Sequence, residues 1–350
     1  METVFYLGAS TAKGFVSHYD SLFQELKLLT ILKGGPGCGK STFMRAIAKA
    51  ARERGLDLSL ILCSSDPGSL DGILLPELSV GFVDGTAPHA LEPRLCGGSM
   101  NYLNFGEFYD RAAMRPNEEE IFAVQQENAL CYAHVTACMG AADQLQNSVR
   151  LMTDQHSYDE EMAAIAESLA LSALQPTGQS PQIRRRFLSA VTPRGLHFCT
   201  GTPGALCEKV YVLRDNYGLA PRLLTRLQEK AAEMGHTSIL CYSPQLPEEA
   251  PTHLLIPTAH AAFVSESRNF MFSEPAFCRM DLDSAIPAGE RKEMEFCEKI
   301  MTDLLYRSVK HMRDAKKLHD RMEDLSRPFV DFSAVDEMTK REIALLFGKK

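Results

Sequence analysis

The sequence lacks the features that mark several common protein classes. None of its ten cysteines forms a Cys-x-x-Cys pair, which excludes a zinc ribbon and a thioredoxin motif. No run approaches the 18 apolar residues that a membrane span needs, and residues 1–14 lack a basic segment followed by an apolar core. We therefore expect a cytoplasmic protein with reduced thiols, no secretory signal and no membrane partner.

Excess positive charge is also missing. The chain has 37 Lys+Arg against 45 Asp+Glu, a net charge of −8, so no bulk basic field would attract nucleic acid or an anionic membrane. Helicase motifs are absent as well, and nucleic acid is disfavoured as a partner. With 350 residues, of which 45% are hydrophobic and 23% charged, the sequence is typical of a globular protein of two domains.

The strongest local pattern is a glycine-rich loop between a strand and a helix. Residues 28–33 are apolar and partly β-branched, which predicts a buried strand, and residues 43–54 are good helix formers that end before Gly55. The loop between them reads Gly34-Gly35-Pro36-Gly37-Cys38-Gly39-Lys40-Ser41-Thr42. This sequence fits G-x-x-x-x-G-K-[ST] in a strand–loop–helix context, which predicts a phosphate-binding loop.

Each residue type in this loop has a chemical reason to be there. Glycines let successive backbone N–H groups point inward around an anion, and the helix N-terminus adds its positive dipole end. We expect Lys40 to reach the β- and γ-phosphates of a nucleotide, Ser41 to offer its hydroxyl to Mg²⁺, and Thr42 to bond an α-phosphate oxygen. Cys38 is open to two interpretations, a low-pKa thiol beside Lys40 or a passive loop residue.

These residues resemble the P-loop NTPase superfamily. The resemblance implies a second apolar strand that ends in an Asp holding Mg²⁺ through water. Residues 78–84 supply such a strand ending in Asp84, and Gly85-Thr86-Ala87-Pro88-His89 follows it. Lys40 and Asp84 are thus the expected catalytic residues, Ser41 and Asp84 the metal ligands, and ATP with Mg²⁺ the cofactors. The alternative for Asp84 is an ordinary surface turn. ATP is expected in preference to GTP because no Asn-Lys-x-Asp motif is present.

Two further side chains are weaker candidates near the same site. Residues 58–63 predict another buried strand, followed by Ser64-Ser65-Asp66-Pro67-Gly68. Ligands of open α/β sheets sit at the carboxyl ends of strands, so Asp66 is a candidate to orient water, contact Mg²⁺ or bind a substrate. A plain turn is the alternative for Asp66. His89 is a candidate near the γ-phosphate end, and a solvated loop histidine is its alternative.

Shifting the chain by 181 residues reveals an internal repeat. Residues 6–15 fall on 187–196, and residues 29–33 fall on 210–214, without a gap. In the same register, Ile73-Leu74-Leu75-Pro76 meets Leu254-Leu255-Ile256-Pro257, and Phe82-Val83 meets Phe263-Val264. Few residues are identical, but the shared register predicts a duplicated fold.

The same offset predicts that the second copy has lost its nucleotide chemistry. Its three functional positions change from Lys40 to Pro221, from Ser41 to Arg222 and from Asp84 to Ser265. Asp215 would also put negative charge where phosphate belongs. The second half is therefore predicted to be a scaffold, a regulator or a donor of residues to the first site. Arg194, Arg214 and Arg222 are candidates for a donated contact to phosphate, with plain surface roles as the alternative.

Helical segments are expected after each sheet. Residues 117–174 predict a helical hairpin, and residues 289–325 carry apolar side chains at helical spacing as its equivalent in the second half. Within the latter, residues 310–324 mix both charge signs and predict a solvated helix face. Residues 175–181 are rich in Pro, Gly and polar side chains, which places a linker and the domain boundary near residue 180.

We therefore predict an α/β protein of two pseudo-repeated P-loop NTPase-like domains, each a mainly parallel sheet flanked by helices with a helical hairpin insertion or extension. Residues 1–180 would form the domain with the intact Walker A motif and the helical insertion. Residues 181–350 would form a degenerate P-loop-like domain with C-terminal helices. The whole pattern resembles a family of bacterial tandem P-loop ATPases of unassigned role, which implies ATP binding and hydrolysis without a settled substrate.

Three functions are consistent with this pattern. The leading hypothesis is Mg-dependent ATP binding and hydrolysis by the first domain, with the second as scaffold or regulator; no Glu follows Asp84 as an obvious base, so hydrolysis is expected to be slow or partner-dependent. A nucleotide or small-molecule kinase is an alternative, because Gly-Gly-Pro-Gly-x-Gly-Lys is similar to the loop of nucleoside monophosphate kinases. The third is a nucleotide-switched module whose helical hairpins bind a protein partner.

Overall fold

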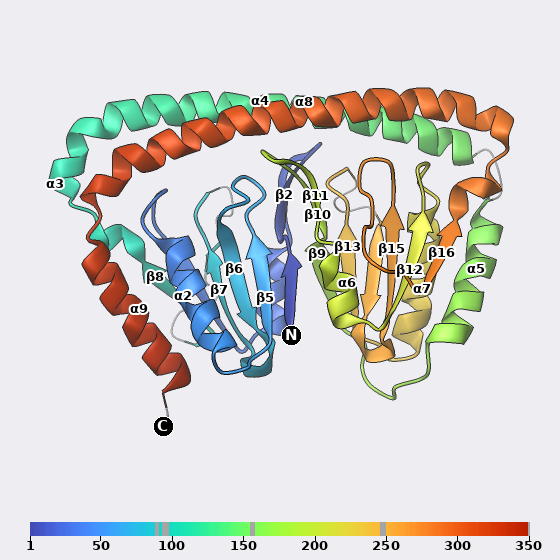
Figure 1. Cartoon of the computed structure of the whole chain (residues 1–350), viewed down its shortest axis with the longest axis horizontal. Helices are drawn as coiled ribbons and strands as arrows, with labels where there is room; N and C mark the ends of the chain where they lie inside the picture. The colour runs from blue at the N-terminus through green and yellow to red at the C-terminus, as the bar shows by residue number, and fades with distance from the viewer. Residues whose placement is uncertain (88–90, 93–97, 155–157, 246–249, 349–350) are drawn as a thin grey trace.

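The protein contains two six-stranded mixed sheets that lie side by side beneath a pair of long helices (Figure 1). The computed structural model describes residues 1–87, 91–92, 98–154, 158–245 and 250–348. In spatial order, the first sheet consists of β1 (Glu2–Phe5), β5 (Leu58–Leu62), β6 (Leu70–Leu75), β7 (Val80–Asp84), β4 (Leu28–Lys33) and β8 (Met100–Asn104). The strand predicted over residues 28–33 is confirmed as β4.

The second sheet repeats the strand order of the first. Its strands, in the matching order, are β9 (Ile183–Phe187), β13 (Ser238–Tyr242), β14 (His253–Ile256), β15 (Ala261–Glu266), β12 (Lys209–Arg214) and β16 (Cys278–Asp281). β6 and β14 run antiparallel to both of their neighbours, and the other pairings in each sheet are parallel. The prediction of an α/β fold with two mainly parallel sheets is thereby confirmed at the level of architecture.

Backbone features of the first half recur 181 residues later in the second half. Tyr6 forms a β-bridge with its own counterpart Phe187: the Tyr6 N–H donates to the Phe187 carbonyl at 2.9 Å and the Phe187 N–H donates to the Tyr6 carbonyl at 2.8 Å. Ser79 and His260, also 181 residues apart, are the two non-glycine residues of the described chain with positive φ, at 55° and 52°. The two halves are therefore related by a pseudo-twofold axis that passes close to this bridge.

Two long helices span the top of both sheets. These are α4 (Glu118–Asp154) and α8 (Ala288–Ser326), which run antiparallel to each other (Figure 1). A helix of this length is about 55 Å long at about 1.5 Å per residue, so it extends over both halves. Val135 and Met139 of α4 form one apolar cluster with Leu305, Val309 and Met312 of α8. The predicted helical hairpins are therefore wrong, because each long helix buries its apolar stripe against its counterpart from the other half.

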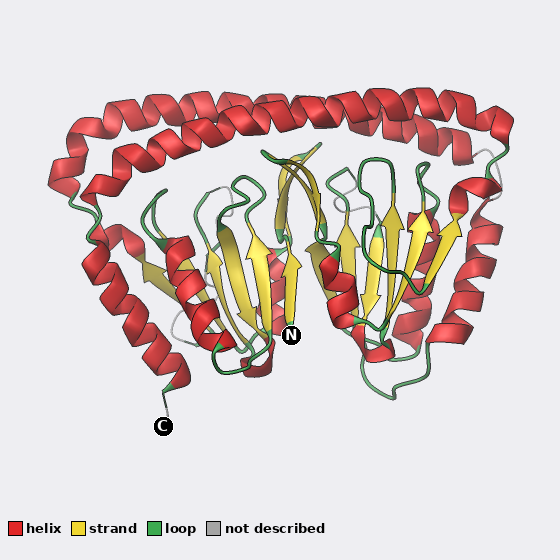
Figure 2. Cartoon of the chain, viewed as in Figure 1, coloured by secondary structure: helices red, strands yellow, loops and turns green. Residues whose placement is uncertain are grey.

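The shorter helices cross between halves in the same way. α5 (Tyr158–Ala173) packs on α7 (Ala220–Glu233) of the second half, and the C-terminal α9 (Phe332–Phe347) packs on α2 (Lys40–Arg52) of the first. Helices cover the outer faces of both sheets (Figure 2). The strands before and after the linker therefore form separate sheets, whereas helices of each half pack on the other half. The predicted domain boundaries stay a prediction. Short α-helices complete the fold: α1 (Leu22–Glu25), α3 (Arg111–Met114) and α6 (Gly201–Leu206).

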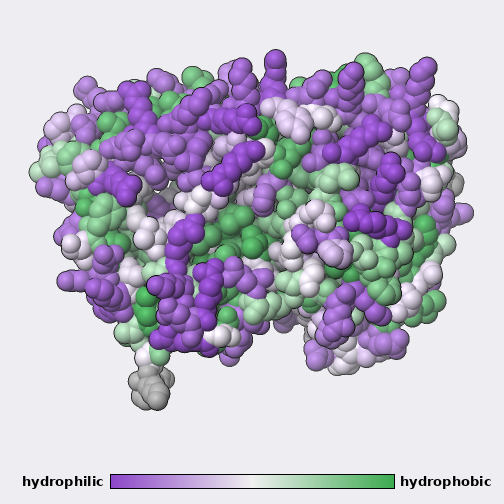
Figure 3. Space-filling view, in the orientation of Figure 1, coloured by the Kyte–Doolittle hydropathy of each residue, from purple (hydrophilic) through white to green (hydrophobic). Residues whose placement is uncertain are grey.

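The two sheets meet along a continuous apolar core. Phe5 and Tyr6 from the first half lie in one buried cluster with Phe187 and Leu188 from the second. Two hairpins lie over this junction, β2 (Gly8–Thr11) with β3 (Gly14–Ser17), and β10 (Ser189–Thr192) with β11 (Gly195–Phe198). The upper, outward surface formed by the long helices is mainly hydrophilic (Figure 3). No helix in the described ranges combines the length and apolar character required to cross a bilayer.

A buried ion pair ties the halves together below the core. Arg186 is 4% exposed and donates to both carboxylate oxygens of Glu25, at 3.0 Å and 2.5 Å, and to Ser21 Oγ at 3.0 Å. Removing one partner of such a pair leaves the other charged, buried and poorly paired, which is strongly destabilising.

We expect Arg186→Ala to lower the free energy of unfolding by about 3 kcal/mol, because Glu25 would then lose its bidentate partner. Chemical denaturation followed by circular dichroism measures this change. Arg226→Ala is the control, since Arg226 forms an exposed pair with Glu229 on the same helix and should cost less than about 1 kcal/mol. Equal effects of the two substitutions would contradict a structural role of the buried pair.

Candidate functional site

The predicted glycine loop connects β4 to α2. Gly37 and Gly39 have φ of 73° and 98°, which favours glycine at both positions, and Gly39 caps the N-terminus of α2. Lys40 is the first residue of that helix, and Ser41 and Thr42 lie in its first turn. The loop of residues 34–42 therefore has the strand–loop–helix geometry that the sequence predicts, and its backbone N–H groups gather at a helix N-terminus.

Lys40 is folded back over this loop. Its Nζ donates to the carbonyl oxygens of Gly34 and Gly35, at 2.6 Å and 2.9 Å, and lies 3.6 Å from Cys38 Sγ. The side chain is almost completely buried, with 9% of the residue exposed. Burial raises the pKa of the Cys38 thiol despite the nearby ammonium group, so a low-pKa thiol at this position is wrong.

Asp84 lies at the carboxyl end of β7, directly beside β4. The parallel register pairs it with Leu32, just before the loop. One carboxylate oxygen accepts hydrogen bonds from the backbone N–H and hydroxyl of Thr86, at 2.9 Å and 2.6 Å. The other lies 3.6 Å from Lys40 Nζ. Asp84 is thus held by its own turn with one oxygen directed to the lysine, and the two predicted catalytic residues are brought together.

Ser41 and Asp84 both line one cavity of about 720 Å³ above the glycine loop. Ser41 Oγ accepts a hydrogen bond from the Leu70 N–H at 3.0 Å, and its hydroxyl hydrogen is free to turn elsewhere. A hydroxyl and a carboxylate are the oxygen donors that Mg²⁺ takes, and this ion uses few protein ligands beside phosphate and water. The residues present therefore fit the expected metal.

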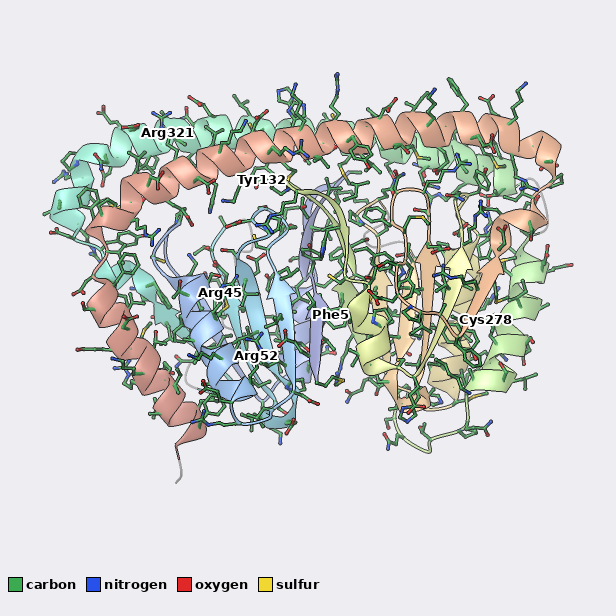
Figure 4. The ribbon with its side chains drawn as sticks, in the orientation of Figure 1. Phe5, Arg45, Arg52, Tyr132, Cys278 and Arg321 are labelled. Atoms are coloured by element: carbon green, nitrogen blue, oxygen red, sulfur yellow. The ribbon has the colours of Figure 1, made fainter. Side chains whose placement is uncertain are left out.

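The cavity has walls from both halves of the chain. Arg45 of α2 and Tyr132 of α4, which are labelled in Figure 4, both line it. The C-terminal half closes the opposite side with residues from α8 and the segment that follows it: His319, Met322, Glu323, Ser326, Arg327 and Phe332. The site therefore lies at the edge of the first sheet and is covered by helices. One of these helices, α8, starts over the second sheet.

Side chains that cover the site contact the glycine loop directly. A Cβ added to Gly37 would lie 3.3 Å from Cβ of Glu323, and one added to Gly39 would lie 3.3 Å from Cγ1 of Val335. The Tyr109 hydroxyl donates to the Pro36 carbonyl at 3.0 Å. The outer side of the loop is therefore packed against side chains that the sequence does not connect to it.

Glu323 is held by a neighbour on the same helix face. His319 Nε2 lies 3.5 Å from its carboxylate, and Lys316, one turn earlier, lies 3.6 Å from Asp66 of the first half. The hydrogen bond from His319 lowers the pKa of the Glu323 carboxyl; burial opposes this, and the Lys316 charge and the Gly37 N–H support it. The predicted solvated face of residues 310–324 is wrong for His319 and Glu323, because both are half-buried and line the cavity.

The remaining candidates are placed differently. Asp66 lines the cavity, whereas His89 lies outside the described residues. Arg222 pairs with Asp154 and Asp159, and Arg214 lies 3.5 Å and 3.7 Å from Asp281 and Asp283. Of the three arginines, Arg194 comes closest to the site: one of its terminal nitrogens lies 3.7 Å from where a Cβ on Gly68 would be.

The equivalent loop of the second half is filled by its own side chain. The Asp215 carboxylate accepts backbone N–H bonds from the next turn, at 2.8 Å to 3.2 Å, and the donors are Tyr217, Gly218, Leu219 and Ala220. Only about 70 Å³ of cavity remains beside it. The Asp215 carboxylate thus fills its own turn and satisfies four successive backbone N–H groups.

Glu298 of α8 lies over this second loop and is 5% exposed. Burial raises the pKa of its carboxyl to about 7, the Arg268 charge opposes the shift, and Asp215 and Asp283 add to it. In the unfolded chain the pKa is about 4.5. Between these two values the folded protein binds more protons than the unfolded chain, so stability falls as pH rises through this window.

We expect the free energy of unfolding to fall by up to about 3 kcal/mol between pH 4.5 and 7 through this one group, at about 1.4 kcal/mol per unit of pKa shift. Glu298→Gln should remove that part of the slope and stabilise the protein at pH 8. Glu293→Gln, at an exposed position of the same helix, is the control. Parallel stability–pH curves for wild type and Glu298→Gln would contradict the raised pKa.

Known proteins do not identify this chain. It matches no family model, no curated protein and no solved structure. Its fold class is α/β, with two six-stranded mixed sheets flanked by helices. A functional assignment therefore depends on the chemistry of the glycine loop, Lys40, Ser41 and Asp84.

Proposed function

We propose that the glycine loop is a P-loop, and that the first half of the chain binds Mg-ATP and hydrolyses it. The observation that carries the proposal is the approach of Lys40 Nζ to Asp84 Oδ2, 3.6 Å apart, across two adjacent parallel strands at the N-terminus of α2. This places a cation, a carboxylate and a set of backbone N–H groups around one point. Few roles other than phosphate binding require that combination.

Each residue has a part in holding the nucleotide. The loop N–H groups would bind phosphate oxygens, and Lys40 would leave the carbonyls of Gly34 and Gly35 to reach the β- and γ-phosphates. Ser41 and Asp84 would hold Mg²⁺ between them, directly and through water. When bound, the ion would neutralise part of the charge on the phosphates. Lys40 would neutralise a further part of the same phosphate charge.

In hydrolysis, a water oxygen forms a bond to the γ-phosphorus while the bond to the bridging oxygen breaks, so that ADP and phosphate leave. Gly85 follows Asp84, so the carboxylate that commonly activates water in this position is missing. We therefore expect slow turnover. The kinase and switch hypotheses use the same binding residues, and phosphate release without an added acceptor separates hydrolysis from both.

Lys40→Ala should abolish Mg-ATP binding, lowering affinity by at least about 100-fold, because the phosphates lose their buried cation. Isothermal titration calorimetry should give one site per wild-type chain. Lys49→Ala, an exposed position on the same helix, is the control and should bind normally. Two sites per chain, or unchanged binding by Lys40→Ala, would contradict the proposal.

Asp84→Asn should retain nucleotide binding at high Mg²⁺ but weaken the apparent Mg²⁺ affinity about 10- to 100-fold, as is usual when a residue that positions a metal ligand is changed. Phosphate release measured against Mg²⁺ concentration tests this. Glu53→Gln, which changes an exposed acid just after α2, provides the comparison. A Mg²⁺ dependence identical to that of wild type would exclude Asp84 from the metal site.

A further inference from the structure

Glu323, an acidic residue from the second half, packs against the glycine loop of the first. Glu323 of α8 lines the same cavity as Lys40, and its Cβ would be 3.3 Å from a Cβ on Gly37. The Gly37 N–H is among the groups that stabilise its ionised form. This N–H belongs to the set that would bind phosphate, so Glu323 approaches the groups that a nucleotide needs.

The second half shows what a carboxylate does in such a loop. There Asp215 accepts four successive N–H bonds from its own turn and fills the anion position. Because Asp215 lies at the start of the loop that it fills, it cannot leave without unfolding that turn. Glu323 belongs to α8 and not to the loop, so it can move away from the Gly37 N–H without unfolding the loop.

Electrostatic repulsion would act on Glu323 when phosphate binds in the loop. A carboxylate and a polyphosphate carry the same sign, and at a few ångströms inside a protein their repulsion is large. His319 Nε2 lies 3.5 Å from the Glu323 carboxylate, and it offers the displaced carboxylate a partner. Lys316, which lies 3.6 Å from Asp66, would then remain as a positive group of this helix face.

We propose that Glu323 is a displaceable plug of the nucleotide site, expelled from the loop when the phosphates of Mg-ATP bind. The proposal deepens the proposed function and rests on it. Since Val335 of α9 packs on Gly39 of the same loop, expulsion of Glu323 also alters the contacts of the segment between α8 and α9. Nucleotide occupancy in the first half is thereby coupled to the position of a helix that begins over the second half (Figure 1).

The test compares nucleotide affinities in full-length variants. Glu323→Gln keeps the shape of the side chain and removes its charge, and it should bind Mg-ATP about 10-fold more tightly than wild type, since about one like-charge repulsion is relieved. Asp324→Asn, the adjacent exposed acid on α8, is the matched control and should bind as wild type does. Lys40→Ala should lose binding with or without Glu323→Gln.

The length of the phosphate chain supplies an independent readout. The increase in affinity caused by Glu323→Gln should be largest for Mg-ATP, smaller for Mg-ADP and absent for AMP. The reason is that a plug competes only with phosphates that reach the loop. Hydrogen exchange of residues 316–335 should become faster when Mg-ATP binds to wild type. In Glu323→Gln these amides should exchange faster already without nucleotide.

The outcomes separate this proposal from the proposed function. Binding that depends on Lys40 but has the same affinity in Glu323→Gln would overturn the plug and leave the nucleotide site standing. Slower phosphate release at unchanged affinity would also overturn it, since Glu323 would then act in the chemical step. Absence of Mg-ATP binding in both wild type and Glu323→Gln would overturn the plug together with the proposed function.

Discussion

The antiparallel packing of α4 against α8 is the interaction on which the rest of the structure depends. Each helix buries its apolar stripe against its counterpart from the other half. Because both helices extend over two sheets, their ends deliver α5 and α9 to the opposite half. The two halves of the chain are therefore held together by an exchange of helices, and they share one helical layer.

This exchange makes the site in the first half a joint product of both halves. The glycine loop, Lys40 and Asp84 come from the first half, whereas side chains of α8 and the start of α9 line the same cavity from the second half. Packing against the loop at Gly37 and Gly39 means that the loop cannot change conformation without affecting the helices above it. A movement of the loop would therefore also move the helical layer.

The two loops illustrate how one backbone design serves two purposes. In both halves a strand leads through a loop into a helix. In the second half Asp215 accepts four backbone N–H bonds of the loop, and the neighbouring Glu298 is buried beside it. In the first half the buried Lys40 instead donates to the carbonyl oxygens of Gly34 and Gly35.

The sequence by itself determined the parts that depend on neighbours along the chain: strand 28–33, the glycine loop with Lys40, the carboxylate of Asp84 at a strand end, and the 181-residue repeat with Asp215 in its second loop. Local periodicity and turn chemistry carry that information. The sequence could not show that Glu323 and Val335 lie on the glycine loop, nor that residues 117–174 form no hairpin. Those contacts join residues far apart along the chain, and the amphipathic pattern of a helix shows that it needs a partner without showing which one. Only the packing of the two halves decided that choice.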